Sequence, residues 1–319
     1  MRNYVLKRLV LVLPTLALIS TLGFFAVRSL PGRPLALRPS SSELGLQYQE
    51  SLVASETPLK SYLVWIRRLL RFDWGESIYY EEPVLRVIGD RLPISLLLGL
   101  LSGLTTYAVC IPLGVLKALR HGSRIDAVTT GVLTFLQAVP PFALGILLIG
   151  LAGRWFPLGG IRSDSFASLS SAGRFFDLAH HLFLPVTAAV ASNLAMLTQL
   201  TKNSLLDELS QPYVLAGHAR GLSRKRTVLH ALRGASLPVF THVGHSISLL
   251  LSGNLMVETV FSIPGIGRLT YDSILRRDYP VIVTLLLLFS LANVVGTLVG
   301  DLLSAWADPR VDLVGRPTC

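Results

Sequence analysis

Charge is the scarcest property of this sequence. Only 15% of its 319 residues are charged, against about 25% in an average soluble domain, while 51% are hydrophobic. A soluble enzyme of this length would need more charge to cover its surface. Disorder is excluded as well, because disordered chains are rich in charge and poor in large aliphatic residues. The 26 glycines and 18 prolines follow no fixed period, which excludes collagen-like and low-complexity chains.

Cysteine is almost absent. Of the two cysteines, Cys110 lies inside an apolar run and Cys319 is the final residue, which excludes a disulfide framework and a cysteine-based metal site. The charge that is present is unbalanced, with 29 basic residues against 19 acidic ones and a net charge of +10. Such an excess points to nucleic acid or to a membrane surface. The mean hydropathy of +0.57 favours the membrane, so we expect no nucleic-acid partner.

Six runs contain no Asp, Glu, Lys or Arg: 9–27, 93–116, 127–153, 182–201, 237–257 and 281–300. Each approaches or exceeds the roughly 20 apolar residues that a helix needs to cross a bilayer. The first run lacks the short apolar core and small-residue cleavage site of a signal peptide, so we expect it to be retained as an anchor. The pattern predicts an all-α membrane protein with six transmembrane helices.

The orientation is predicted from Lys and Arg in short loops, which stay on the cytoplasmic side. Three segments on one side of an alternating bundle carry such residues: the N-terminus, the loop after the second run and the loop after the fourth. The basic residues of these three segments are Arg2, Lys7, Arg8, Lys117, Arg120, Arg124, Lys202, Arg220, Arg224, Lys225, Arg226 and Arg233. We therefore expect both termini to be cytoplasmic.

The absence of acid from the six runs bears on mechanism. Proton- or sodium-coupled carriers usually place carboxylates near the middle of the membrane, so their absence argues against a secondary carrier. The sequence also lacks the His-Glu-x-x-His, Gly-x-Ser-x-Gly and Gly-x-x-x-x-Gly-Lys-Ser/Thr motifs. We therefore expect no catalytic residues and no cofactor. Any uphill transport must draw its energy from another polypeptide.

The long loop after the fourth run contains a helix–glycine–helix pattern. Four residues at helical spacing share one face of a short helix: Tyr213, Ala216, Gly217 and Arg220. Gly221 suits a left-handed helix end, and Ser223 suits the N-cap of the next helix. These residues alone leave two interpretations open, a docking element for a partner protein or a basic loop that binds lipid head groups.

A second candidate site follows the fifth run. Here Glu258 precedes the turn Pro264-Gly265-Ile266-Gly267. We expect a rigid turn anchored by Glu258 rather than a phosphate loop, because no strand precedes it. The histidine pairs at 180–181 and at 242 and 245 would suit nickel, yet each is an incomplete ligand set, so no metal site is predicted.

Several ordered motifs resemble one family. The loop from Tyr213-Val214 through Gly221-Leu222-Ser223 to Leu237-Pro238 is similar to the cytoplasmic EAA loop of ABC importer permeases. Further stretches agree over nearly the whole chain: Leu30-Pro31-Gly32, Asp73-Trp74-Gly75-Glu76-Ser77, Val257-Glu258 through Gly267-Arg268, Arg277-Asp278-Tyr279-Pro280 and Asp308-Pro309-Arg310. The closest resemblance is to the dipeptide/oligopeptide/nickel permease family, whose members are binding-protein-dependent transport system inner membrane components.

That resemblance implies a type I ABC importer permease fold in the bacterial cytoplasmic (inner) membrane. Residues 1–92 would form an N-terminal transmembrane helix plus an extracytoplasmic segment, and residues 93–319 a five-helix core with a cytoplasmic coupling loop at about 203–236. A homologous permease subunit would pair with this one as a heterodimer in the lipid bilayer. Two ABC ATPase subunits would hydrolyse ATP, and an extracytoplasmic solute-binding protein would deliver the substrate.

The resemblance also assigns two sets of residues. The ATPase-coupling loop would comprise Tyr213, Ala216, Gly217, Arg220, Gly221, Leu222 and Arg224. A turn at the outer gate would comprise Glu258, Pro264, Gly265, Gly267 and Arg268. The sequence departs from the family at Leu215-Ala216-Gly217 in place of Glu-Ala-Ala, at Arg33 in place of an acid and at Ile263 in place of Trp. Di- or oligopeptides are the favoured substrates, with nickel, another small solute or peptide export as alternatives.

Overall fold

The computed structural model describes residues 2–29 and 58–307, and every regular element in these ranges is helical. The helices are α1 (Arg2–Ser29), α3 (Pro58–Leu70), α4 (Val84–Leu119), α5 (Arg124–Ala138), α6 (Pro141–Ala152), α7 (Ser171–Leu209), α8 (Pro212–Ala219), α9 (Arg224–Ala235), α10 (Leu237–Ser252), α11 (Leu255–Val260), α12 (Ile266–Arg276) and α13 (Tyr279–Ala307). A short 3₁₀ helix, η1 (Phe166–Ser168), precedes α7. The motifs at 30–33 and 308–310, and Cys319, lie outside the described residues.

Three of these helices are long and apolar enough to cross a membrane: α4, α7 and α13. Helices α5 and α6 meet the same criteria as a pair, but they are bent by 103° at the break between them. In α1 the apolar part covers Pro14–Ala26. The all-helical membrane architecture is confirmed. By length and composition the described residues supply three spans, or four with the bent pair, and the count of six stays a prediction.

Two of the six uncharged runs are interrupted for local reasons. Run 127–153 breaks at Pro140 and Pro141, which lack the N–H that a continuous helix requires. Run 237–257 breaks at Gly253, whose φ of +70° is left-handed, and Asn254 then caps α11 by accepting from the Val257 N–H at 3.2 Å. The division expected at 92–93 falls inside α4, which continues unbroken through it.

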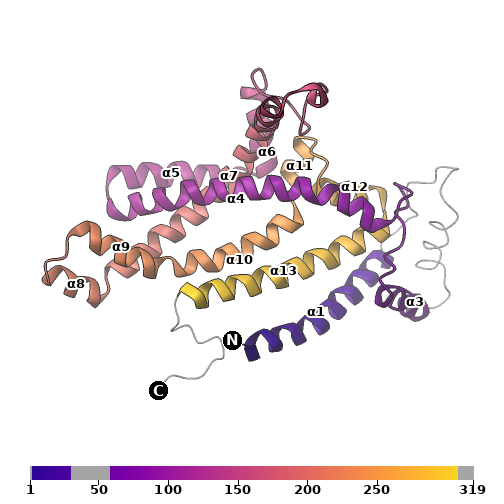
Figure 1. Ribbon diagram of the computed structural model, residues 1–319, viewed down its shortest axis with the longest axis horizontal. Helices are drawn as coiled ribbons and strands as arrows, with labels where there is room; N and C mark the ends of the chain where they lie inside the picture. Colours follow the sequence, from indigo (N-terminus) through magenta and orange to yellow (C-terminus); the bar gives the residue numbers. More distant parts are fainter. Residues whose placement is uncertain (1, 30–57, 308–319) are drawn as a thin grey trace.

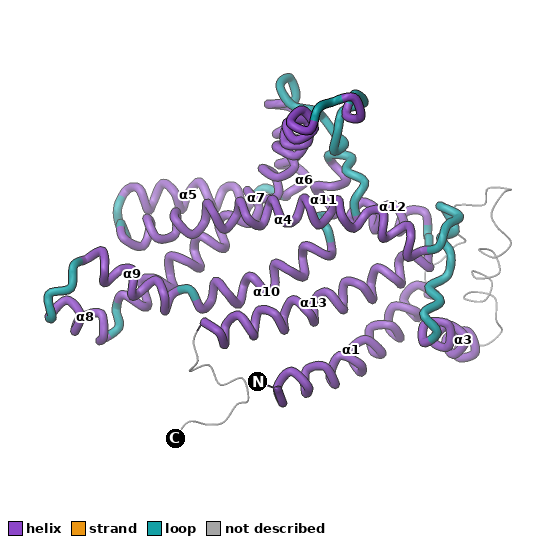
Figure 2. Tube along the Cα trace, in the orientation of Figure 1, coloured by secondary structure: helices purple, strands orange, loops and turns teal. Residues whose placement is uncertain are grey.

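Most of the helices run back and forth along one long axis, and α6 stands at a steep angle to it (Figure 1). Helices α8 and α9 lie at one end of the bundle, and α3 and α12 lie at the other. The start of α1 and the end of α13 both point toward the α8–α9 end. Figure 2 shows that the connections lie mainly at the two ends and beside α6. Helix α10 packs along α13, α4 along α7, and α1 along α13.

Small residues bring the paired helices into close contact. A Cβ added at Gly244 of α10 would overlap the backbone of Gly300 in α13, and one added at Gly114 of α4 would overlap Thr201 of α7. Large apolar side chains such as Leu104 and Phe135 point outward and are mostly exposed. An apolar exterior around tightly packed helix seams is typical of a bundle that has lipid for a solvent.

Candidate functional site

The helix–glycine–helix pattern forms at one end of the bundle. Helix α8 ends at Ala219, and Gly221 then takes a left-handed φ of +82°. The Leu222 N–H donates to the Gly217 carbonyl at 3.1 Å, which is the hydrogen bond of a Schellman helix end. Ser223 lies at the N-cap of α9, without a side-chain capping bond. The turn is therefore fixed by its backbone.

The predicted coupling residues are mostly exposed on this element. Tyr213, Ala216, Arg220 and Arg224 are exposed, whereas Gly217 is buried. A Cβ at Gly217 would lie 3.0 Å from the Leu222 side chain, so its small size serves packing within this chain. The helix face that these residues were predicted to share is therefore only partly exposed for contact with another protein.

Tyr213 holds α8 against the end of α7. Its hydroxyl donates to the Glu208 carboxylate at 2.6 Å. Loss of hydration around the hydroxyl, together with the neighbouring carboxylate, raises the pKa of Tyr213 to about 12. The phenol therefore stays protonated, and remains a donor, at any physiological pH.

Val214 attaches this end to the rest of the bundle, and sequence reasoning did not single it out. Its buried side chain belongs to an apolar cluster that joins α4, α7, α8 and α9 and comprises Ala118, Leu205, Val214, Ala231 and Ala235. On α9, a Cβ at Gly234 would overlap the Glu208 carboxylate. Helices α8 and α9 therefore pack as a unit on α4 and α7.

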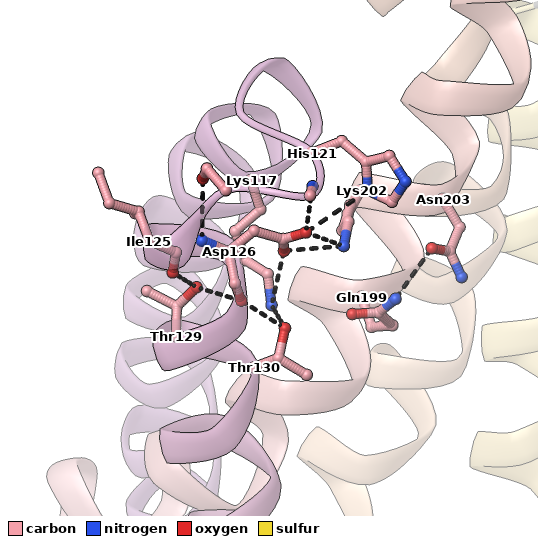
Figure 3. A network of polar contacts seen from close by, with 11 residues as sticks. Lys117, His121, Ile125, Asp126, Thr129, Thr130, Gln199, Lys202 and Asn203 are labelled. Atoms are coloured by element: carbon pink, nitrogen blue, oxygen red, sulfur yellow. Dashed lines mark hydrogen bonds and ion pairs between the residues drawn. The ribbon is translucent and has the colours of Figure 1, made fainter.

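A buried ionic cluster lies at the same end of α4, α5 and α7 (Figure 3). Lys202 of α7 donates to both carboxylate oxygens of Asp126, at 2.8 and 2.7 Å. Lys117 of α4 lies 3.9 Å from the same carboxylate and donates to Thr130 at 2.8 Å. The Gly122 N–H adds a hydrogen bond to Asp126 at 3.2 Å. One carboxylate thus ties three helices together.

Sequence reasoning treated Lys117 and Lys202 only as orientation signals. The structure buries both, with exposed fractions of 1% and 7%. The sequence did contain a signal for this pairing, because Asp126 is the only acidic residue between Asp90 and Asp164. A lone carboxylate among basic residues at the edge of an apolar run is the natural partner for a buried ammonium group.

The turn after α11 is built around Glu258, which is fully buried. Its carboxylate accepts hydrogen bonds from the Ser95 hydroxyl at 2.8 Å, from the Asn254 N–H at 3.2 Å and from the Arg268 N–H at 3.0 Å. Ser95 in turn accepts from the Ile266 N–H at 2.7 Å. Glu258 therefore connects α4, α11 and the first turn of α12.

The glycines of this turn are buried for a steric reason. A Cβ at Gly265 would overlap the Glu258 carboxylate, and one at Gly267 would come within 2.6 Å of the Leu255 backbone. Pro264 is exposed, and the Arg268 side chain lies 3.8 Å from Asp272 on its own helix. The turn is rigid because carboxylate and backbone fill the space that side chains would need.

The histidines are used in local hydrogen bonds. His180 bonds to the Trp155 carbonyl at 2.7 Å, and His181 bonds to the Asp177 carbonyl at 2.8 Å. His242 lies 2.9 Å from the Tyr107 hydroxyl, while the side chain of His245 lies outside the described part. Within the described residues no three His, Cys, Asp or Glu side chains are placed to hold a metal ion.

The described residues thus form a helical membrane bundle that presents a helix–glycine–helix unit at one end. A profile of the binding-protein-dependent transport system inner membrane component matches residues 110–313. The chain belongs to this family. It is a membrane-embedded permease subunit of the inner membrane, and ATP hydrolysis lies on separate subunits.

Full-length relatives agree with the family match. The peptidoglycan transport system permease protein YejB of Agrobacterium fabrum is 34% identical over 99% of this chain and all of its own length. The oligopeptide transport system permease protein AppB of Bacillus subtilis is 35% identical over 98% of this chain and all of its own. The dipeptide transport system permease protein DppB of Escherichia coli K12 is 32% identical over 98% of this chain and 99% of its own.

Proposed function

We propose that this chain forms one half of the translocation path of an ATP-driven importer of di- and oligopeptides. The relatives named for dipeptides and oligopeptides support the substrate class. The observation that carries the mechanism is the exposed end of α8 and α9, which packs as a unit on α4 and α7. A partner that moves this end can move the long helices behind it.

In this proposal the exposed residues of α8 and the turn contact a groove of an ATPase subunit. Tyr213, Ala216 and Arg220 would form the contact, and Arg224 would add charge at the start of α9. The Val214 cluster passes the movement to α4 and α7, and the Asp126 cluster passes it to α5. The Glu258 turn at the opposite end would serve as part of the outer gate.

The proposal includes six transmembrane passes with the α8–α9 end in the cytoplasm. The alternating helix directions and the basic residues at that end support this orientation. The remaining components are a homologous permease in a heterodimer, two ATPase subunits and an extracytoplasmic binding protein for the substrate.

The test is reconstitution of the complete complex in proteoliposomes, with uptake of a radiolabelled tripeptide as the readout. We expect accumulation that requires both ATP and the binding protein. Uptake by this chain alone, driven by a proton gradient, would contradict the proposal. Nickel accumulation without peptide accumulation would instead support a nickel permease. ATP-driven movement of peptide toward the binding-protein side would instead support an exporter.

The coupling role is tested by Gly221→Trp. The bulky residue would strain a left-handed position and distort the surface offered to the ATPase. We expect ATP hydrolysis to continue while tripeptide uptake falls at least about tenfold. Gly131→Trp is the control for bulk, because Gly131 of α5 is exposed and also has open space around it. Equal transport by Gly221→Trp and the wild type would refute the coupling role of the turn.

A further inference from the structure

A cavity of about 290 Å³ lies between α4, α7, α10 and α11. Its lining runs along α4 from Ser95 to Tyr107, a rise of about 18 Å at 1.5 Å per residue. Ser95 also donates to Glu258, so the cavity begins directly beneath the turn that we assign to the outer gate. A lining that extends this far along α4 has room for an extended chain.

A chain of hydrogen-bonding groups lies at the other end of the cavity. The Tyr107 hydroxyl is 2.9 Å from His242 Nδ1 and 2.9 Å from the Ser246 hydroxyl. Both His242 and Ser246 belong to α10, one turn apart, so the tyrosine joins α4 to α10. All three side chains are half-buried and line the cavity.

The described residues that line the cavity include no Asp, Glu, Lys or Arg. A metal cation would find no carboxylate here, and an anion would find no fixed positive charge. On α7, Asn193 donates its amide to the Ala189 carbonyl at 3.0 Å. The cavity therefore offers neutral donors and acceptors between apolar walls, which match the alternating N–H and C=O groups of a peptide backbone.

We propose that this cavity binds the backbone amides of the transported peptide, with Tyr107, His242 and Ser246 as its hydrogen-bonding groups. The inference rests on the proposed import function and names the residues that contact the substrate on its path. An extended peptide advances at most about 3.3–3.6 Å per residue, so about five residues span the cavity. Because backbone groups are common to all peptides, this site accepts many sequences and selects against solutes without amides.

The experiment uses the full reconstituted complex with Tyr107→Phe, Ser246→Ala and the double variant. Each change removes only a hydroxyl. We expect tripeptide uptake to fall about three- to tenfold in the double variant, while ATP hydrolysis stimulated by the binding protein stays within twofold of the wild type. Tyr271→Phe is the matched control, since Tyr271 is exposed on α12 away from the cavity and should transport normally.

A second measurement compares a tripeptide with its analogue methylated at the peptide nitrogens. The binding protein is identical in every sample, so a change in preference between permease variants must arise in the permease. We expect the double variant to lose most of the wild-type preference for the unmethylated peptide. If the double variant is poorly folded, Ser246→Ala alone is measured and should shift the preference in the same direction.

The outcomes separate the two hypotheses. A wild-type complex that accumulates no peptide overturns the proposed function and this inference with it. A wild-type complex that imports peptide, together with a double variant of equal rate and equal preference, overturns the inference and leaves the proposed function standing.

Discussion

The Glu258 side chain holds the turn after α11 together through several hydrogen bonds. Its buried carboxylate accepts from a hydroxyl and from two backbone N–H groups of different elements. A carboxylate survives without a charged partner when hydrogen bonds of this kind surround it. The side chain therefore determines the shape of the turn, and its contacts lie within this chain.

The first prediction concerns Glu258→Ala. Removal of the carboxylate leaves the N–H groups of Asn254 and Arg268 unsatisfied, and each buried donor of this kind costs about 1–3 kcal/mol. We expect the free energy of unfolding to fall by about 2–4 kcal/mol, measured by thermal unfolding in detergent. Glu82→Ala is the control, because the Glu82 carboxylate makes a long, exposed ion pair with Arg86 at 3.9 Å. A loss no larger than that of the control would disprove the anchoring role.

The second prediction compares the same substitution at two glycines. Gly221 and Gly131 both have open space where a Cβ would lie, but only Gly221 has a left-handed φ. We expect Gly221→Ala to destabilise the α8–α9 turn by about 1–2 kcal/mol and Gly131→Ala, in the middle of α5, to stabilise by up to about 1 kcal/mol. Limited proteolysis of the turn and thermal unfolding measure the two effects. If the two substitutions change stability in opposite directions, the backbone conformation at Gly221 is the cause.

At the scale of elements, buried side-chain contacts join the ends of α4, α5 and α7 to one another and to α8 and α9, in addition to the loops. The Val214 cluster fastens α8 and α9 to α4 and α7, and Asp126 fastens α5 to α4 and α7. Both joints lie at the end of the bundle whose exposed residues we propose to contact the ATPase. Movement at this end therefore involves the long helices together.

The third prediction tests the ionic joint. Asp126→Asn leaves two buried ammonium groups without their counter-charge, and breaking a buried ion pair in this way costs about 3–5 kcal/mol. We expect a loss of that size in detergent unfolding, against almost none for Asp207→Asn, whose side chain is exposed at the end of α7.

A companion variant separates charge from packing. Replacing the cluster by apolar residues, as Asp126→Leu with Lys117→Met and Lys202→Met, should recover most of the stability lost in Asp126→Asn, because apolar replacements of buried ion pairs are often neutral. If the triple variant is as unstable as Asp126→Asn, the cost is steric and the electrostatic explanation is wrong.

For the molecule as a whole, the two ends differ in kind. One end carries basic, exposed residues on a short helical unit, and the other carries the closed Glu258 turn and the contact of α3 with α1 and α13 through Trp65. A difference between the two ends is expected of a protein that meets an ATPase on one side of a membrane and a binding protein on the other.

The fourth prediction tests that orientation with single cysteines. In a background of Cys110→Ala and Cys319→Ser, we expect a membrane-impermeant maleimide added to intact spheroplasts to label Asp164→Cys. Arg120→Cys and Arg220→Cys should react only after the membrane is opened. Arg120, Asp164 and Arg220 are all exposed, so accessibility in the folded protein is not limiting. The reverse pattern would invert the proposed topology.

The sequence by itself determined the class of this protein, because a run of about 20 uncharged residues has few alternatives to a helix in lipid. It also determined the left-handed turn at Gly221, which depends on the local backbone. Motif resemblance identified the family that the full-length relatives support.

Only the tertiary structure decided which polar residues act together. Lys117, Asp126 and Lys202 are separated along the chain, and their pairing depends on how α4, α5 and α7 pack. The same holds for Tyr107 with His242, 135 positions apart. A hydrophobic run specifies that a helix lies in the membrane, but not which residue of another helix it faces. The cavity, the ionic joint and the partly buried face of α8 arise from that packing.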